Sequence, residues 1–436
     1  MRADAPAAWL SVAEARSAIL ADVRPLPAER RALLHALGHV LAEELRAPLD
    51  LPTCDNSAMD GFAVRGADVR GASAERPVRL PVVGEVRAGA LPERAVGAGE
   101  AVRITTGSPL PEGADCVVRI EHTAPDGADA VLVLRDDDAG HNVRRRGEDV
   151  RAGDLVLPVG TVLGAGPLAV AASLGRAQLS VVRRPVVGVL ASGDELVEVD
   201  GFAEVAAGRR IVSSNSYALA AQLAEIGCEA RLLGIAHDTP QSLRTHLEAA
   251  AGCDALVTAA GMALGEHDLM RAVLGELGLE LGFWRVRMRP GSPFGYGRVA
   301  ALGGIPWFGL PGNPVSAMVT FEVLARPALL RLAGHAAVFR PTLRVRLLDD
   351  YRAAPGLTHF ARARLSRGPD GEPRAALTGP QGSGVLTSMA HADALLVIPP
   401  ERAGAAAGER LTALRLTAGL QAEAEYDAAA DLAADA

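Results

Sequence analysis

Carboxylates and small polar residues recur in this sequence at loops next to apolar segments. The loop at 55–61 reads DNSAMDG and places Asp55 and Asp60 on either side of Asn56 and Ser57. Carboxylate oxygens suit a hard divalent cation. A lone tripeptide of this type is more often an Asx turn, in which Asp and Asn bond their own backbone. The motif alone therefore leaves both interpretations open.

A second loop lies in the stretch DALVTAAGMALGEHD at 254–268. Residues 255–258 form a short apolar run, which suits a buried parallel strand. Gly261 and Gly265 give the loop that follows little side-chain bulk, and Asp268 precedes a segment with helical spacing. Backbone N–H groups at such a junction can face an anion, and the helix dipole favours negative charge there. An ordinary strand–helix turn is an equally good interpretation of this loop by itself.

The elements that must position such loops alternate regularly from residue 185 onward. Alternating strands and helices predict an open, mainly parallel sheet with helices on both faces. Ligands of such sheets bind beyond the carboxyl ends of the strands. Predicted strands cover 186–190, 230–235, 255–258, 283–288, 296–302 and 307–310, and predicted helices cover 215–226, 242–251, 269–277 and the segment that ends at 332. The groups that follow strand ends, and should converge, are Glu195, Asp238, the 261–268 loop, Arg289 and Ser316.

The remaining segments differ in character from this alternation. Residues 1–46 are predicted to be helical, because apolar residues recur along them. Residues 47–142 contain strand-like segments between Gly and Pro turns, which predicts a small β-rich domain. The apolar helix expected at 168–174 can pack back on the first segment, which would make the β-rich domain an insertion. Residues 338–420 return to strand patterning and predict a small barrel, followed by a frayed Ala/Asp/Glu-rich tail.

Composition restricts the class of protein. The chain has 436 residues, 49% hydrophobic and 22% charged, which is typical of a globular protein of several domains. Its net charge of −8 does not indicate that the protein binds nucleic acid. The four cysteines form no CxxC pair, so neither a zinc site nor a disulfide framework is indicated. All 44 Lys and Arg positions hold arginine, so the presence of arginine rather than lysine at any one position is not evidence of a function there. With no signal pattern and no membrane-length apolar run, a cytoplasmic location is expected.

Eight collinear motifs resemble the molybdopterin molybdenumtransferase family, which includes MoeA and the gephyrin E-domain. They are DNSAMDG at 55–61, TGSPLPEGAD at 106–115, HNVRRRGED at 141–149, SGDEL at 192–196, GEHD at 265–268, RPGSPFGYGR at 289–298, GLPGNPVSA at 309–317 and QGSG at 381–384. Any one of them alone is a weak signal, and a charged turn is the usual interpretation of 141–149. Their common order makes the resemblance specific.

The resemblance implies a multidomain fold, α/β plus β, in a homodimer whose active cleft lies between subunits. The expected domains are an elongated helical linker domain (1–46 and 143–184), an inserted β-rich domain (47–142), a parallel, doubly wound α/β domain of the MoaB/Mog type that binds molybdopterin (185–334), a C-terminal β-barrel (338–420) and a disordered tail (421–436).

The resemblance also implies an activity, the insertion of molybdate into adenylylated molybdopterin with release of AMP and with Mg²⁺ as cofactor. A molybdopterin adenylyltransferase would hand over the substrate, and neither nucleic acid nor a membrane is involved. The family's acidic catalytic cluster matches Asp60, Asp149, Asp238, Asp268 and Glu195, of which Asp60, Asp238, Asp268 and Glu195 are the implied metal ligands. Positions that match its nucleotide- and oxyanion-binding residues are Thr106, Gly261, Gly265, Arg289, Ser292, Pro293, Ser316, Arg362 and Ser383.

Departures from the family pattern leave two hypotheses open. The usual Lys-Pro-Gly-Lys-Pro is replaced by RPGSP at 289–293, so Ser292 does not keep a positive charge. A charge-assisted hydrogen bond is worth about 1.5–3 kcal/mol, so its loss would weaken molybdate binding roughly 10–150-fold. The usual Ser-Gly-Gly-Val-Ser is AAGMA at 259–263, and a methyl group at Ala260 matters if φ is positive there. The chain is therefore either an active transferase or a non-catalytic paralogue that binds the pterin nucleotide or a partner protein. An isolated adenylyltransferase is disfavoured, because the inserted domain and the barrel are both expected.

Overall fold

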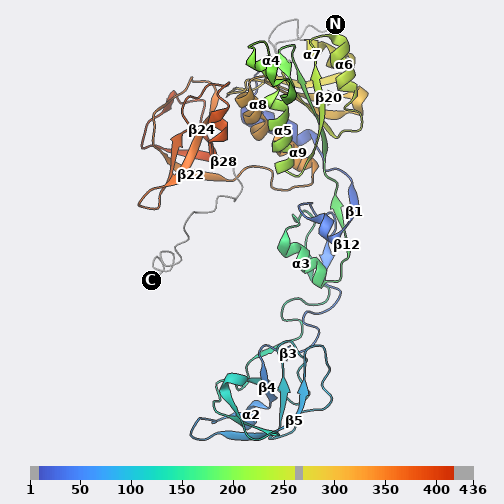
Figure 1. Ribbon diagram of the computed structural model, residues 1–436, viewed down its shortest axis with the longest axis vertical. Coiled ribbons are helices and arrows are strands. Elements are labelled where there is room, and N and C mark those ends of the chain that lie inside the picture. The colour runs from blue at the N-terminus through green and yellow to red at the C-terminus, as the bar shows by residue number, and fades with distance from the viewer. Residues whose placement is uncertain (1–8, 261–268, 417–436) are drawn as a thin grey trace. The chain divides into compact units, whose positions relative to one another are not determined.

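The computed structural model describes residues 9–260 and 269–416 of the chain. The chain divides into two compact units: unit 1 comprises residues 1–30, 38–42 and 180–436, and unit 2 comprises residues 31–37 and 43–179. Figure 1 shows the elements of both units in the order of the chain. Across the described ranges, no helix is long and apolar enough to cross a membrane.

A six-stranded sheet is the centre of unit 1, with the strand order β16-β13-β17-β21-β20-β18. The first four strands pair in parallel, which confirms the predicted mainly parallel sheet, whereas β20 and β18 pair antiparallel at one edge. This antiparallel edge was not predicted. The strands are β13 (Val186–Ser192), β16 (Glu229–Ala236), β17 (Ala255–Ala259), β18 (Leu279–Arg285), β20 (Pro293–Val299) and β21 (Ile305–Leu310).

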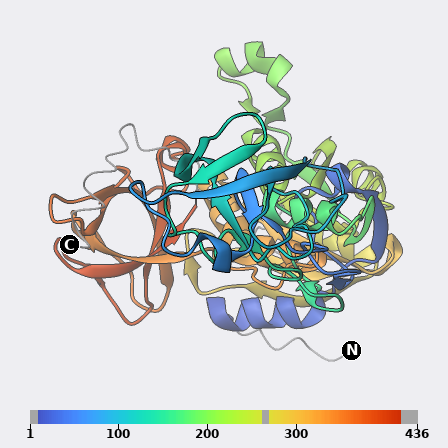
Figure 2. The same ribbon diagram turned by 90° about the horizontal axis from the view of Figure 1, so that it is seen from below.

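Helices cover both faces of this sheet, as predicted. The central strand β17 shows the division, because Val257 packs into one buried cluster and the adjacent Leu256 into the other. The first cluster contains residues of α1 (Val12–Asp22), α5 (Ser214–Glu225), α8 (Pro314–Thr320), a π-helical turn (Phe321–Ala325) and α9 (Arg326–Leu332). The second contains residues of α6 (Pro240–Glu248) and α7 (Leu269–Glu276). In Figure 2, α1 is the blue helix near the N-terminal label.

The C-terminal part of unit 1 is a closed five-stranded barrel, which confirms the predicted barrel. The strands pair in the order β24-β25-β22-β28-β26, and β26 pairs again with β24 to close it. A short strand from the α/β region, β19 (Met288–Arg289), extends this sheet by pairing in parallel with β24. The barrel strands are β22 (Thr342–Leu347), β24 (Thr358–Arg367), β25 (Pro373–Leu377), β26 (Ala394–Ile398) and β28 (Arg410–Arg415), with the smaller elements β23 (Tyr351–Arg352), β27 (Gly404–Ala405) and α10 (Thr387–Ala390).

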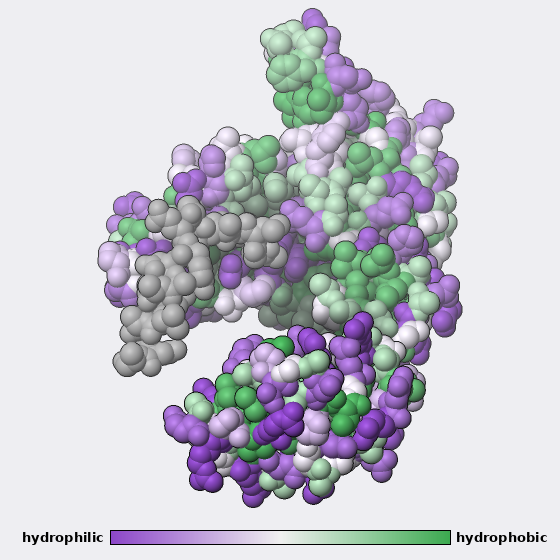
Figure 3. Space-filling view, turned by 60° about the horizontal axis from the view of Figure 1, so that its bottom comes forward, coloured by the Kyte–Doolittle hydropathy of each residue, from purple (hydrophilic) through white to green (hydrophobic). Residues whose placement is uncertain are grey.

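A small arm projects from the α/β part of unit 1, as Figures 2 and 3 show. It begins with β14 (Leu196–Val197) and ends with β15 (Ile211–Val212), and these two strands pair in parallel. Between them lie the turn Val199–Gly201 and the short helix α4 (Phe202–Ala206). The arm exposes several apolar side chains, and 61% of the Phe202 surface is accessible.

Unit 2 is built around a six-stranded sheet of its own, in the order β7-β4-β6-β5-β9-β8. Gly61 begins strand β4, which lies between β7 and β6, and a Cβ atom at this position would overlap the Val118 carbonyl oxygen of β7. The sheet strands are β4 (Gly61–Val64), β5 (Val78–Val86), β6 (Ala101–Ile104), β7 (Cys116–Arg119), β8 (Thr123–Pro125) and β9 (Ala130–Val133). The remaining elements are β2 (Leu45–Arg46), β3 (Asn56–Ser57), α2 (Gly66–Val69), a 3-10 turn (Ile120–His122), β10 (Val143–Arg144), β11 (Leu155–Leu157) and α3 (Ala165–Ser173).

The prediction that residues 1–46 are helical is wrong beyond α1. The chain forms β1 (Ala28–Ala32), a 3-10 turn at Leu33–Ala36 and then β2. Strand β12 (Gln178–Val182) follows much later in the chain. The Leu33 N–H donates to the carbonyl of Ala177, so the backbone bonds a distant segment rather than its own preceding turn. Leu34 is 81% exposed. The helical spacing of these leucines therefore marks no buried helical face.

Candidate active site

Arg362 is a buried cation in the barrel strand β24. Only 1% of its surface is exposed, and its guanidinium donates from Nε to Ser388 Oγ at 3.1 Å and from Nη2 to the Gly382 carbonyl at 3.0 Å. Both acceptors are neutral, and no carboxylate pairs with this guanidinium anywhere in residues 9–260 or 269–416. Burial lowers the pKa of Arg362. An arginine is seldom buried without an anionic partner, so this group is suited to binding an anion.

The loop that contains Ser383 is fastened to the strand that carries Arg362. The Gln381 side chain accepts from the Arg362 N–H at 2.8 Å and donates to the Arg362 carbonyl at 3.1 Å. At its other side, the Ser383 carbonyl accepts from the N–H of Val315, which precedes Ser316 in the first turn of α8. Arg362, Ser383 and Ser316, which sequence motifs placed far apart, are thereby brought into one region. Gln381 belongs to the QGSG motif but was not predicted as a site residue, and Ser388 lies outside every motif; their hydrogen bonds to Arg362 identify both.

Arg289 is the last residue of β19, and Ser292 lies in the turn that joins β19 to β20. Arg289 is exposed, and β19 aligns it with His359 of the barrel strand β24. Gly291 has a φ of 98°, and a Cβ atom there would overlap Thr320 Cγ2 of α8, so this turn packs closely on the helix of Ser316. Ser292 Oγ donates to the Met288 carbonyl at 2.8 Å. In this structure the hydroxyl hydrogen therefore serves the turn, and the role of Ser292 at the oxyanion stays a prediction. Pro293 begins β20.

The carboxyl ends of β13 and β16 bring two predicted carboxylates to the same edge of the parallel sheet. Glu195 follows β13 and Asp238 follows β16, and both are exposed. Asp194 connects the two loops, because its Oδ1 contacts His237 Nδ1 at 3.0 Å and accepts from the Asp238 N–H at 3.4 Å. These hydrogen bonds, the one from His237 first, lower the pKa of Asp194. Asp194 was not among the predicted residues.

The loop after β17 is described only as far as Ala260. Gly261, Gly265 and Asp268, which were predicted to bind the nucleotide and the metal, lie outside the described residues. Ala260 has a φ of 93°, a conformation that L-amino acids other than glycine rarely adopt. The loop after β21 lies beside it, because a Cβ atom on Gly312 would lie 3.5 Å from the Ala260 Cβ. Asn215 Nδ2 donates to the Gly312 carbonyl at 2.7 Å and fastens that loop.

In unit 2, the predicted residues Asp60 and Thr106 bind each other. Asp60 Oδ1 accepts from the Thr106 N–H at 2.7 Å and from its hydroxyl at 2.9 Å. These bonds, the backbone one first, lower the pKa of Asp60. Both donors of Thr106 therefore serve the carboxylate, whereas the prediction assigned the hydroxyl to a bound nucleotide. The second oxygen of Asp60 has no hydrogen bond to any residue described here.

Asp149 lies in a turn that is held by ion pairs. Arg145 Nη1 lies 2.7 Å from Asp55 Oδ2, and Arg146 Nε lies 2.6 Å from Asp50 Oδ2. Asp149 itself is exposed, and its N–H donates to the Leu51 carbonyl. These ion pairs form the charged turn that is the usual interpretation of this segment, and the place of Asp149 in the acidic group stays a prediction.

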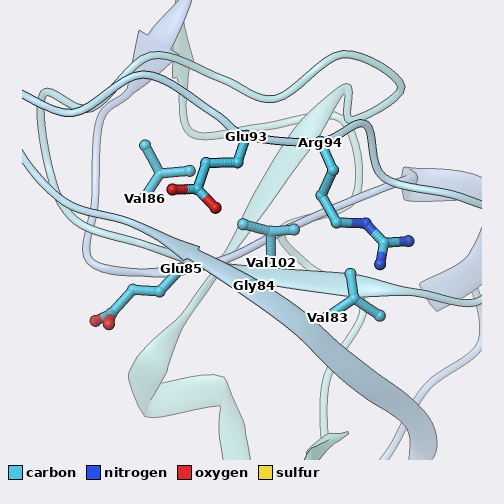
Figure 4. Close-up of a pocket in the computed structure, with 7 residues that line it drawn as sticks. All are labelled: Val83, Gly84, Glu85, Val86, Glu93, Arg94 and Val102. Atoms are coloured by element: carbon cyan, nitrogen blue, oxygen red, sulfur yellow. The ribbon is translucent and has the colours of Figure 1, made fainter.

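No three His, Cys, Asp or Glu side chains within the described parts of the chain gather closely enough to hold a metal ion. Within unit 1, the predicted ligands Glu195 and Asp238 therefore belong to no such cluster of described residues. Unit 2 also has a pocket of about 200 Å³ between the loop of Glu93 and Arg94 and the strands of Gly84 and Val102 (Figure 4). None of the predicted site residues lines this pocket.

Comparison with known families divides the chain into three successive matches. Residues 10–175 match the MoeA N-terminal region (domain I and II), residues 188–331 match a probable molybdopterin binding domain, and residues 344–416 match the MoeA C-terminal region (domain IV). The matches together contain every described residue of the candidate site.

Individual proteins are similar over nearly the whole chain. The molybdopterin molybdenumtransferase of Staphylococcus aureus (strain COL) is 33% identical over 403 residues, which cover 92% of this chain and 94% of that protein. The enzyme of the same name from Haemophilus influenzae is 33% identical over 407 residues, with 92% and 98% covered. The crystal structure of the molybdopterin biosynthesis MoeA protein from Pyrococcus horikoshii OT3 has a TM-score of 0.79 and 29% identity, with 93% and 99% covered.

Proposed function

Because the chain belongs to the MoeA family of molybdopterin molybdenumtransferases, we propose that it inserts molybdate into adenylylated molybdopterin and releases AMP, with Mg²⁺ as cofactor. The substrates contribute two kinds of anion, the tetrahedral molybdate dianion and the phosphates of the nucleotide. The two kinds call for different protein groups. Molybdate needs converging donors with positive charge, and phosphates can be neutralised by a cation that carboxylates hold.

The burial of Arg362 without a carboxylate partner is the observation that carries this proposal. A desolvated guanidinium loses its hydration, and its two bonds to Ser388 and Gly382 satisfy donors but leave the charge uncompensated. A dianion that arrives at this position supplies the missing charge. Arg289, from the turn that packs on α8, adds a second guanidinium. The hydroxyls of Ser316 and Ser383 form no hydrogen bond within the described residues, so both are available to a tetrahedral oxyanion.

The carboxylates fit Mg²⁺ in their chemistry. Mg²⁺ is usually held by one or two carboxylates together with substrate phosphates and water, so a preformed cage of three protein ligands is not required. Glu195 and Asp238 follow adjacent parallel strands, and one oxygen of Asp60 is free of hydrogen bonds within the described residues. We propose that Asp60, Asp238, Asp268 and Glu195 supply the metal ligands and that Asp149 belongs to the same acidic group. When bound, the metal neutralises negative charge on the phosphates as the phosphoanhydride bond breaks.

The remaining parts of the proposal concern the nucleotide and the partners. Gly261 and Gly265 are assigned to close backbone approach of the pterin nucleotide, and Pro293 to the wall beside the oxyanion. Thr106 is assigned to holding Asp60 rather than to direct contact with the ligand, since both of its donors are used there. The chain is proposed to act in the cytoplasm as a homodimer that receives its substrate from a molybdopterin adenylyltransferase.

Molybdate-dependent release of AMP by the purified protein tests the proposal directly. We expect release that requires molybdate, Mg²⁺ and adenylylated molybdopterin together. Asp60→Asn and Asp268→Asn should each abolish it with the fold intact, whereas Asp126→Asn, an exposed carboxylate paired with Arg79 in unit 2, should not change it. Full turnover in both of the first two variants would remove the carboxylates from the mechanism. Binding of molybdate without any AMP release would contradict the transferase assignment and favour a binding protein.

A further inference from the structure

A buried carboxylate of unit 2, Asp138, accepts hydrogen bonds from two separate segments of the chain. Only 2% of its surface is exposed. Its Oδ2 accepts from the Arg119 N–H at 3.0 Å, and its Oδ1 accepts from Arg119 Nε at 3.0 Å and from Asn142 Nδ2 at 2.8 Å. His122 Nδ1 lies 2.8 Å from the same Oδ2. Asp138 lies outside all eight sequence motifs and was not predicted as a site residue.

The charge on Asp138 makes these hydrogen bonds strong. Burial acts to raise the pKa of this carboxyl group, but the hydrogen bonds from Arg119 and Asn142, together with the positive charge of Arg119, outweigh burial and lower it. A buried charge must be hydrogen-bonded, and a bond to a charged group contributes more than a bond between neutral groups. Asp138 therefore holds Arg119 and Asn142 in place more firmly than a neutral acceptor would.

Asn142 connects Asp138 to the loop that contains Asp60. Its Nδ2 donates both to Asp138 Oδ1 and, at 2.9 Å, to the Val117 carbonyl. Its φ of 64° is a conformation that asparagine adopts more readily than most residues do. In this conformation the Asn142 carbonyl accepts from the N–H of Ala58, two residues before Asp60, at 2.9 Å. The orientation of Asn142 therefore fixes the loop on this side of Asp60.

Arg119 connects Asp138 to the other side of Asp60. Arg119 is the last residue of β7, and the antiparallel register places it opposite Gly61, which follows Asp60 in the sequence. The next residue, Ile120, donates its N–H to the Asp60 carbonyl at 3.1 Å. Because Asp138 bonds both the N–H and the side chain of Arg119, it holds this end of the strand in place. Two segments that meet at one buried carboxylate thus support the main chain of Asp60.

We propose that Asp138 is a positioning residue that keeps Asp60 in place for the metal ion. This inference rests on the proposed function, because it extends the assignment of Asp60 as a metal ligand. Asp60 is exposed and Thr106 bonds one of its oxygens, so the direction of the second oxygen depends on where the main chain of the loop lies. Loss of the support from Asp138 weakens metal binding and leaves the chemical step itself unchanged.

Amide hydrogen exchange of the full-length protein, followed by mass spectrometry, tests the support of the loop without any ligand. Asp138→Asn removes the charge with little change of shape, and Asn142→Gly tolerates the positive φ but removes the side chain that reaches Asp138. Each should accelerate exchange in the peptide that contains residues 55–61 roughly 2- to 12-fold, which corresponds to one hydrogen bond of ordinary strength. Asp136→Asn is the matched control and should not, because Asp136 accepts from the Gly71 N–H instead.

The dependence of AMP release on Mg²⁺ tests the positioning role itself. A displaced Asp60 binds the metal more weakly, so the half-saturating Mg²⁺ concentration should rise roughly 2- to 12-fold in Asp138→Asn and in Asn142→Gly, whereas the rate at saturating Mg²⁺ should be close to that of the wild type. A protein that is merely destabilised loses rate at every Mg²⁺ concentration, because fewer molecules are folded. The double variant should show less than the sum of the two effects, since both act through one bond.

Separate outcomes distinguish this inference from the proposed function. If the wild type releases AMP and both variants keep its Mg²⁺ dependence, the inference about Asp138 is wrong, whereas the proposed function stands. Unchanged exchange at 55–61, or faster exchange throughout unit 2, would also overturn the inference. If the wild type releases no AMP at any Mg²⁺ concentration, the proposed function fails and the inference fails with it. Faster exchange at 55–61 together with a higher Mg²⁺ requirement, and neither change in Asp136→Asn, supports the inference.

Discussion

Thr106 directs its backbone N–H and its hydroxyl to the same oxygen of Asp60, at 2.7 Å and 2.9 Å. Both bonds favour the charged carboxylate and lower its pKa. Thr106→Val removes the hydroxyl and keeps the N–H, so we expect the pKa of Asp60 to rise part of the way toward the ordinary value of about 3.9. Carbon-detected NMR titration of the Asp60 carboxyl group measures this change.

Thr106→Ser is the control for that prediction, because it keeps the hydroxyl and should leave the pKa of Asp60 low. Since the folded pKa is the lowered one, the bond stabilises the fold above the ordinary pKa, and this contribution is lost as the pH falls through the folded value. If Asp60 titrates identically in the Val variant and the wild type, the hydroxyl does not hold this carboxylate.

Ser292→Lys should strengthen molybdate binding. The substitution gives up the bond to the Met288 carbonyl and introduces an ammonium group at the edge of the proposed oxyanion site. A charge-assisted bond is worth about 1.5–3 kcal/mol, so the half-saturating molybdate concentration should fall by roughly tenfold or more. Ser292→Met, a long neutral side chain, separates charge from bulk and should show no such gain. An unchanged or higher half-saturating concentration in the Lys variant would argue against a site next to this turn.

Ala260→Gly should stabilise the fold. The φ of 93° places the Ala260 methyl group in a strained position, at a cost of about 1–2 kcal/mol for an L-residue. Glycine removes that strain, but it also raises the conformational entropy of the unfolded chain, which lowers stability by roughly 0.5–1 kcal/mol. The free energy of unfolding should therefore rise by about 1 kcal/mol or less. Ala259→Gly, in the last residue of β17, is the control and should lower it. Urea denaturation of the three proteins decides, and a less stable Ala260→Gly would contradict the strain at this position.

Stability should fall in mildly acidic solution because of His359. Its folded pKa is lowered, so the unfolded chain binds the proton more readily and the contribution is complete only above the ordinary histidine pKa of about 6.5. Below that value the free energy of unfolding should decrease by up to about 1.4 kcal/mol per pH unit. His359→Gln should show a smaller decrease between pH 7.5 and pH 5.5 in urea titrations. Parallel curves for the two proteins would mean that His359 titrates normally.

The parallel sheet could be predicted because each of its parallel strands has a sequence of consecutive, mostly apolar residues. Strands β13 and β17 are buried on both faces, so their residues need no alternation, and small or polar residues punctuate their ends. The sequences of β18, at the sheet edge, and of its neighbour β20 did not indicate antiparallel pairing, because antiparallel strands there bury the same apolar residues as parallel ones would. Helical spacing was misleading at 28–46 because spacing alone does not say which face is buried.

The candidate site was predictable as a set of residues but not as an arrangement. Arg362 is one of four arginines between 362 and 374. The amino-acid sequence does not indicate that Arg362 is buried and its neighbour Arg364 exposed. Its strand, β24, was missed because these charges interrupt the apolar pattern. The hydrogen bond of Ser292 and the partners of Asp138 are set by contacts that arise only in the folded structure.

Strand β19 belongs by sequence to the α/β region, yet its only ladder partner among the described strands is β24 of the barrel. Arg289 thus takes its orientation from a neighbouring fold, and Arg362 takes its from the loop that touches α8 through Val315. A fragment that ended at Leu332 could retain every strand of this six-stranded sheet. It would nevertheless lack Arg362 and the strand β24 that orients Arg289. Anion binding therefore depends on the α/β region and the barrel together. Replacing either of them alone would be expected to abolish it.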